Sequence, residues 1–144
     1  MSMCRRRVVV TLLTMSSAVV LAGCGRPRYP VRGRASYANA EPYTGQGFVV
    51  AEATIDGKPV SARAMIAADG TFTLAGRREG DGVMAGTYRV RLIGPRNSGD
   101  VDSGAPIPLP FDKKFLAFET SGLTLEVGKG QADLIIDLGA KPRR

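Results

Sequence analysis

From residue 31 onward, the chain consists of short runs in which apolar and polar residues alternate, separated by Gly, Asp and Pro. A period of two places the apolar residues on one face of a β-strand. No stretch of ten residues in this region has the period of a helix. Seven runs are predicted to form strands: residues 31–35, 48–55, 60–66, 71–74, 88–92, 123–127 and 134–138. The pattern therefore predicts an all-β fold over residues 31–139, a seven-stranded antiparallel Greek-key sandwich.

Two Asp-Gly pairs mark turns between these strands. Asp56-Gly57-Lys58-Pro59 follows the second strand, and Ala68-Asp69-Gly70-Thr71 follows the third. Asp-Gly tolerates the positive φ angles of a tight hairpin, so the second of these turns is predicted to be the strongest hairpin of the chain. We expect four inward-facing side chains to share the core: Phe72, Tyr88, Leu125 and Ile136.

The segment from Gly94 to Ser121 interrupts the strand pattern. Its polar first part, residues 97–104, is predicted to be mobile, and the segment from residue 97 to residue 110 either binds a partner or only connects the strands. No bidentate Glu follows the two aspartates of this loop at calcium-loop spacing, so no metal site is predicted. The second part has enough apolar residues to pack on the sheets: Phe111, Phe115, Leu116 and Phe118. The candidate binding-loop residues are Asn97, Asp100 and Asp102.

Residues 1–24 have the order of a secretory leader. Basic residues stand at positions 5–7, an apolar run extends from Val8 to about Leu21, and small residues follow. This run is shorter than the roughly 20 apolar residues that a membrane-spanning helix needs, and it contains Thr and Ser. The pattern therefore predicts a signal peptide over residues 1–23.

The end of the leader, Leu21-Ala22-Gly23-Cys24, resembles the lipobox of bacterial lipoproteins at all four positions. The resemblance implies cleavage between Gly23 and Cys24 and attachment of acyl chains, palmitate among them, to Cys24. Two or three such chains anchor a protein stably, at about 0.8 kcal/mol per buried methylene. Localisation is then the extracytoplasmic side of the cell envelope, and Gly25, in place of an Asp retention signal, favours the outer membrane.

Residues 24–30 are expected to form the lipidated cysteine and an extended tether, because they include two prolines and a glycine. Arg26 and Arg28 of this tether either meet anionic lipid headgroups or only keep it solvated. Residues 140–144 are expected to form a basic C-terminal tail.

The amino-acid composition argues against most catalytic mechanisms. The 144 residues include no histidine and two cysteines, of which Cys4 would leave with the signal peptide. Imidazole-dependent zinc sites and Ser-His-Asp or Cys-His catalysis need histidine, and a single cysteine permits no internal disulfide. We therefore expect no enzyme activity, no cofactor and no metal.

The net charge of +7 includes three leader arginines, so the mature chain is only mildly basic. Its basic residues are dispersed, without the clustered patch and stacking aromatics of nucleic-acid binding. No nucleic-acid partner is predicted.

Six sequence segments resemble the transthyretin-like, carboxypeptidase regulatory-like domains of bacterial lipoproteins. They are YPVRGRA at 29–35, DGKPV at 56–60, ADGTFTL at 68–74, GTYRV at 86–90, IP at 107–108 and TSGLTLEV at 120–127. The resemblance spans residues 29–139 and implies a transthyretin-like or immunoglobulin-like sandwich. The stretch from Tyr37 to Gly47 is longer than in that pattern, and alanines replace polar residues at positions 67 and 68. These motifs are turn and core determinants, so they indicate fold and hardly function.

Two functional hypotheses remain. The first is a non-catalytic interaction or structural module, anchored to the membrane, whose partners are other envelope proteins. The second is a carbohydrate-binding module in which Tyr37 and Tyr43, on the loop before the second strand, stack on a sugar. The sequence leaves the partner and the oligomeric state open.

Overall fold

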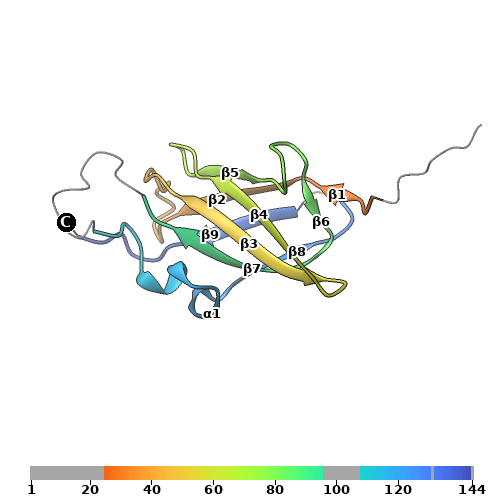
Figure 1. Ribbon diagram of the computed structural model, residues 1–144. Coiled ribbons are helices and arrows are strands. Elements are labelled where there is room, and N and C mark those ends of the chain that lie inside the picture. The colour runs from red at the N-terminus through yellow and green to blue at the C-terminus, as the bar shows by residue number, and fades with distance from the viewer. Residues whose placement is uncertain (1–24, 96–107, 131, 144) are drawn as a thin grey trace, which may run out of the picture.

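The computed structural model describes residues 25–95, 108–130 and 132–143, and about half of them are in strands (Figure 1). Three sheets form, with strand orders β4-β3-β7-β8, β5-β2-β9 and β1-β6. The strands are β1 (Arg28–Tyr29), β2 (Val31–Ser36), β3 (Phe48–Ile55), β4 (Lys58–Met65), β5 (Thr71–Leu74), β6 (Val83–Met84), β7 (Gly86–Ile93), β8 (Leu123–Val127) and β9 (Ala132–Asp137). The helices are η1 (Lys113–Leu116) and α1 (Phe118–Ser121).

Each of the seven predicted strands is present, and their apolar residues face a common interior. Buried side chains come from both large sheets, including Val31 and Ile136 from one and Val49 and Val90 from the other. The four side chains predicted to share the core, Phe72, Tyr88, Leu125 and Ile136, are all buried. The fold is therefore all-β, with an arrangement compatible with a sandwich.

The four-stranded sheet is antiparallel throughout. Its β3–β4 hairpin turns on Asp56 and Gly57, whose φ angles are 50° and 72°. Two successive positive φ angles define the type I′ turn, whose twist matches that of the flanking strands. The predicted turn at this position is confirmed.

The three-stranded sheet corrects one prediction. Its central strand β2 pairs antiparallel with β5 but parallel with β9, from Val31 opposite Ala132 to Ser36 opposite Asp137. The fully antiparallel arrangement is therefore wrong for this pair. A parallel pair needs a long connection, and here the chain between β2 and β9 passes through the other large sheet.

The turn at Asp69-Gly70 forms, but it is not a hairpin within one sheet. The amide of Gly70 donates to the carbonyl of Ala67 at 2.9 Å, which closes the turn. Beyond it, β5 pairs with β2, and among the described residues an isolated bridge joins Arg63 of β4 to Ala75, just after β5. The turn therefore carries the chain from one large sheet to the other, which corrects the prediction.

Part of the predicted tether is structured. Arg28 and Tyr29 form β1, which pairs with Met84 and Val83 of β6. Strand β6 lies between the predicted strands 71–74 and 88–92, and its Val83 is buried. Figure 1 shows β1 and β6 at the end of the domain opposite the C-terminus.

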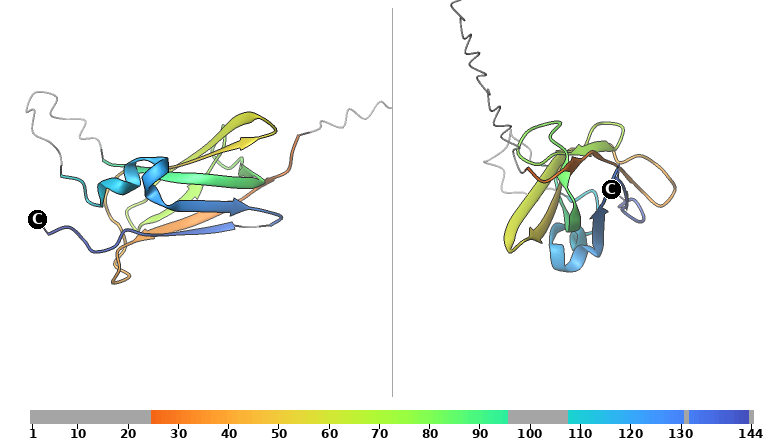
Figure 2. Two further views of the ribbon diagram at one scale, coloured as in Figure 1. Left: turned by 90° about the horizontal axis from the view of Figure 1, so that it is seen from below. Right: turned by 90° about the vertical axis from the view of Figure 1, so that its right-hand side faces the viewer.

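The two short helices lie beside β7, at one side of the molecule (Figure 2). Phe111 and Phe115, on the segment predicted to pack on the sheets, are buried. Among the described residues, no helix has both the length and the hydropathy to cross a membrane.

Candidate binding surface

Several predicted site residues lie outside the part of the chain that the structure describes. They are Gly23 and Cys24 at the predicted cleavage and lipidation site, and Asn97, Asp100 and Asp102 of the candidate binding loop. Tyr37 and Tyr43 are described.

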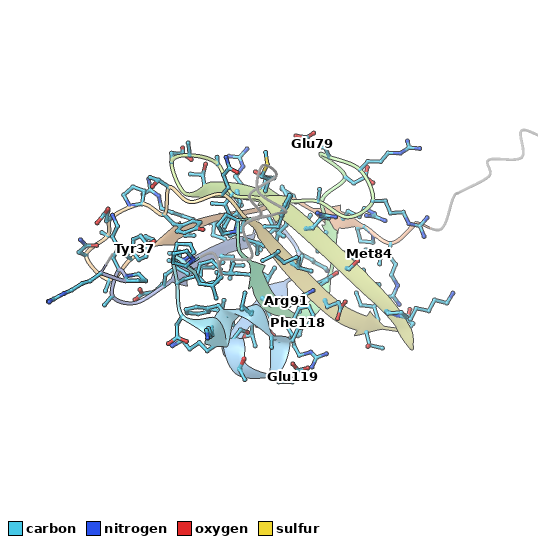
Figure 3. All side chains as sticks on the ribbon, turned by 60° about the vertical axis from the view of Figure 1, so that its left-hand side comes forward. Tyr37, Glu79, Met84, Arg91, Phe118 and Glu119 are labelled. Atoms are coloured by element: carbon cyan, nitrogen blue, oxygen red, sulfur yellow. The ribbon has the colours of Figure 1, made fainter. Side chains whose placement is uncertain are left out.

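The two tyrosines do not form a sugar-binding platform. Tyr43 is fully buried and Tyr37 is 6% exposed, so neither ring offers a face to a ligand. Figure 3 shows Tyr37 among neighbouring side chains near one end of the domain. Its hydroxyl donates to the carbonyl of Pro110 at 2.9 Å, and that of Tyr43 donates to the carbonyl of Gln46 at 3.1 Å. The carbohydrate prediction is therefore wrong for these residues.

The reason is an aromatic cluster that closes this end of the core. The rings of Tyr37 and Tyr43 meet edge to face at 6.1 Å between centroids, Tyr43 meets Phe111 at 6.0 Å, and Phe111 meets Phe115 at 6.3 Å. Such geometry stabilises beyond the area buried. Burial, with a smaller contribution from Tyr37, raises the pKa of Tyr43 to about 12. The loop before β3 therefore contributes Tyr37 and Tyr43 to the hydrophobic core.

A different surface, the outer face of the four-stranded sheet, carries a regular set of side chains. The buried Val49 and Ala51 point into the core, so their neighbours on β3 point outward. The strand register aligns these outward residues in three rows, each with one residue from β4, β3 and β7. The rows are Met65–Phe48–Ile93, Arg63–Val50–Arg91 and Ser61–Glu52–Arg89.

This face is hollowed into a groove of about 830 Å³, which we call the outer-face groove. Most of the surface in it is apolar, and it has one basic residue on each side of Val50. Its lining residues on the three strands are Phe48, Val50, Glu52, Ser61, Ala62, Arg63, Met65, Arg91 and Ile93. Met65, on β4, is 69% exposed.

The two arginines of the outer-face groove are held in different ways. The Arg63 guanidinium lies over the ring of Phe48, at 4.8 Å from its centroid. Arg91 lies over the ring of Phe118 at 5.1 Å and donates from Nη1 to the carbonyl of Leu116 at 3.3 Å. Figure 3 shows Arg91 beside Phe118. Aromatic contacts fix the guanidinium planes without consuming their hydrogen-bond donors.

Arg91 also has an unsatisfied donor. Its Nε is buried and has no hydrogen-bond partner among the described residues. A buried donor without an acceptor costs about 1–3 kcal/mol, more for a charged group.

The described groups whose pKa is shifted lie away from the outer-face groove. The pKa shifts resolved in the structure belong to Glu41, Tyr43, Asp69 and Tyr88, none of which lines it. Within the described ranges, no three His, Cys, Asp or Glu side chains gather in a way that could hold a metal ion. The apolar surface and the two arginines of the groove suit an apolar and anionic group.

Sequence reasoning missed this surface, although β3 carried a signal for it. Most of its residues, FVVAEATI, are apolar, so apolar side chains fall on both faces of the strand. In a strand with one face in solvent, apolar and polar residues alternate more regularly along the sequence. The run of apolar residues through Phe48 and Val50 therefore indicated that part of the outer face is apolar.

Comparison with known proteins yields no relative. No protein-family model matches the chain, and neither curated proteins nor solved structures give a match.

Proposed function

We propose that this protein is a lipoprotein of the cell envelope, anchored through Cys24, and that its domain binds another envelope protein through the outer-face groove. The anchor is supported by the order of basic, apolar and small residues before Cys24 and by the lipobox match. Acyl chains on Cys24 hold the domain on the extracytoplasmic side of a membrane, and the outer membrane agrees with Gly25.

We also propose that the domain is a transthyretin-like sandwich with Greek-key connections. Successive strands change sheet repeatedly: β2 to β3, β4 to β5 and β8 to β9 each pass between the two large sheets. The immunoglobulin alternative fits less well, because that fold places its first two strands in one sheet, whereas β2 and β3 lie in different sheets.

The observation that carries the binding role is the row Arg63–Val50–Arg91 beside the exposed Met65. An apolar floor between two aromatic-supported guanidinium groups matches an extended segment with an apolar side chain next to an Asp or Glu. Arginine binds carboxylates through two parallel hydrogen bonds, and methionine adapts to varied apolar partners. The function is therefore recognition of such a segment, without catalysis.

Site-specific photo-crosslinking in intact cells tests this function. A crosslinking residue at Met65 is expected to capture an envelope protein, and Arg63→Glu is expected to reduce that capture at least tenfold. Ile135 supplies the matched control, because it is also a large apolar residue, 76% exposed, on a strand of the other large sheet.

The design has clear contrary outcomes. Capture of the same proteins from positions 65 and 135, or capture insensitive to Arg63→Glu, contradicts recognition by the outer-face groove. Capture of a second copy of this chain would show self-association in place of a separate partner. Folding of each variant is checked by circular dichroism, because exposed substitutions at these positions should change stability by no more than about 0.5 kcal/mol.

A further inference from the structure

A second groove, of about 630 Å³, lies between the edge of β4 and the small β1-β6 sheet. Three arginines line it, Arg26, Arg28 and Arg77, and they come from two segments far apart in the sequence. Its other named lining residues include Pro59 of β4 and Met84 of β6. We call it the basic groove.

The arginines of the basic groove are largely available to a ligand. Arg26 forms an ion pair with Asp56 of the β3–β4 turn, and both side chains are more than half exposed. Arg28 and Arg77 take part in none of the ion pairs formed among the described residues. Figure 3 shows Glu79, an acid on the nearby loop, projecting away from the body of the domain.

Arg28 is fixed in place by the fold. Its backbone pairs with Met84 in the β1-β6 sheet. Its guanidinium lies against Gly76, because a Cβ built on that glycine would be 2.4 Å from Arg28 Nη1. Arg28, which was predicted to lie on the extended tether, is therefore held in the surface of the folded domain.

The basic groove lies at the end of the domain where the chain comes from Cys24. Four residue steps separate Cys24 from Arg28, and a fully extended chain spans at most about 14 Å over four steps. Figure 1 shows β1 and β6 at this end. A domain anchored through Cys24 thus holds the basic groove within roughly 14 Å of the headgroup layer, a distance comparable to the Debye length of about 10 Å.

We propose that the basic groove binds the phosphate of an anionic lipid headgroup and thereby orients the domain on its membrane. This inference rests on the lipid anchor proposed above. The planar guanidinium group binds phosphate bidentately, and basic residues close to a membrane are attracted to anionic lipids. Binding sets the β1-β6 end on the membrane and leaves the aromatic cluster at the distal end.

Fluorescence quenching on vesicles tests this orientation. The mature chain has no cysteine other than the lipidated Cys24, so one introduced cysteine can carry the label. Gly128→Cys places it at the β1-β6 end, where a side chain meets nothing within 4 Å, and Ala140→Cys places it at the distal end. The lipidated full chain is bound to vesicles of phosphatidylcholine alone or with phosphatidylglycerol, each containing a spin-labelled headgroup quencher.

On anionic vesicles, quenching at position 128 is expected to exceed that at position 140 at least twofold, and high salt should remove most of the excess. The double variant Arg28→Gln, Arg77→Gln should also remove it. The control Lys113→Gln, Arg143→Gln removes the same charge elsewhere and should leave it unchanged. Gly76→Ala retains every charge but displaces the Arg28 guanidinium, so an intermediate loss is expected.

The results distinguish failure of the lipid site from failure of the anchor. Equal quenching at position 128 on neutral and anionic vesicles, or quenching insensitive to the double variant, overturns the basic groove as a lipid site. Loss of the excess quenching with inorganic phosphate, but not with chloride of equal ionic strength, is expected of competition for a phosphate site, whereas equal loss with both salts overturns the groove as a phosphate site. Failure to float with neutral vesicles contradicts the anchor instead. In that case, salt-sensitive flotation with anionic vesicles supports the basic groove as a lipid site, and no flotation with them overturns it.

Discussion

The ring of Phe72 lies directly over the α-carbon of Gly33, its cross-strand partner in the three-stranded sheet. A Cβ built on Gly33 would be 2.2 Å from Phe72 Cζ and 2.6 Å from the carbonyl oxygen of Leu134. The second contact is with backbone on the parallel strand β9, so a small shift of the ring cannot remove it. An aromatic ring covering a strand glycine stabilises a sheet at its weakest backbone position.

Gly33→Ala is therefore expected to destabilise the domain by about 1–3 kcal/mol, the usual cost of overpacking. Gly128→Ala is the matched control, because a Cβ there meets nothing within 4 Å. Urea denaturation followed by circular dichroism measures both. Equal midpoints for the two variants would contradict the close packing of Phe72 on Gly33.

Tyr43 makes stability sensitive to alkaline pH. Its pKa is raised from 10.0 to about 12, chiefly by burial, so folding favours the neutral phenol. This contribution to stability is complete below pH 10 and is lost as pH rises from about 10 to about 12. Ultraviolet titration of tyrosinate should show a late-ionising group that Tyr43→Phe removes. If the same late group persists in that variant, Tyr43 is not its source.

Asp69 has the opposite dependence, at acid pH. Hydrogen bonds from the Thr71 hydroxyl at 2.6 Å and the Thr71 amide at 3.0 Å hold the pKa of Asp69 below its ordinary value of 3.8. The stabilisation is present above about pH 4 and is lost as pH falls through the lowered pKa. Asp69→Ala should lower the urea midpoint at pH 7 and lower it less at pH 2. If Asp69→Ala lowers the urea midpoint equally at both pH values, stabilisation by the ionised Asp69 side chain is contradicted.

Much of the fold was predictable because strand periodicity and turn chemistry are local. The alternation in residues 123–127 and the Asp56-Gly57 turn each specify their own geometry. The sheet to which a strand belongs is not local. Nothing in the residues of β9 distinguishes parallel pairing with β2 from an antiparallel neighbour, and the Asp69-Gly70 turn has the same composition whether it joins paired strands or two sheets.

The candidate binding surface was less predictable, because it depends on which neighbours cover a side chain. Tyr43 stands among loop residues in the sequence, yet Phe111, far along the chain, provides the partner that buries it. Conversely, Phe48 and Val50 look like core residues, but the register places them outward beside Arg63. Strand register and long-range packing decide both cases.

The central claim is that a lipid on Cys24 holds a binding domain on the membrane, and metabolic labelling with an alkyne fatty acid tests it most directly. The wild-type chain should incorporate the label and begin at Cys24 by mass spectrometry of its N-terminal peptide. Cys24→Ala should incorporate no label and retain residues 1–23 or leave the membrane. Equal labelling of the two chains, or a mature N-terminus other than Cys24, would contradict the account.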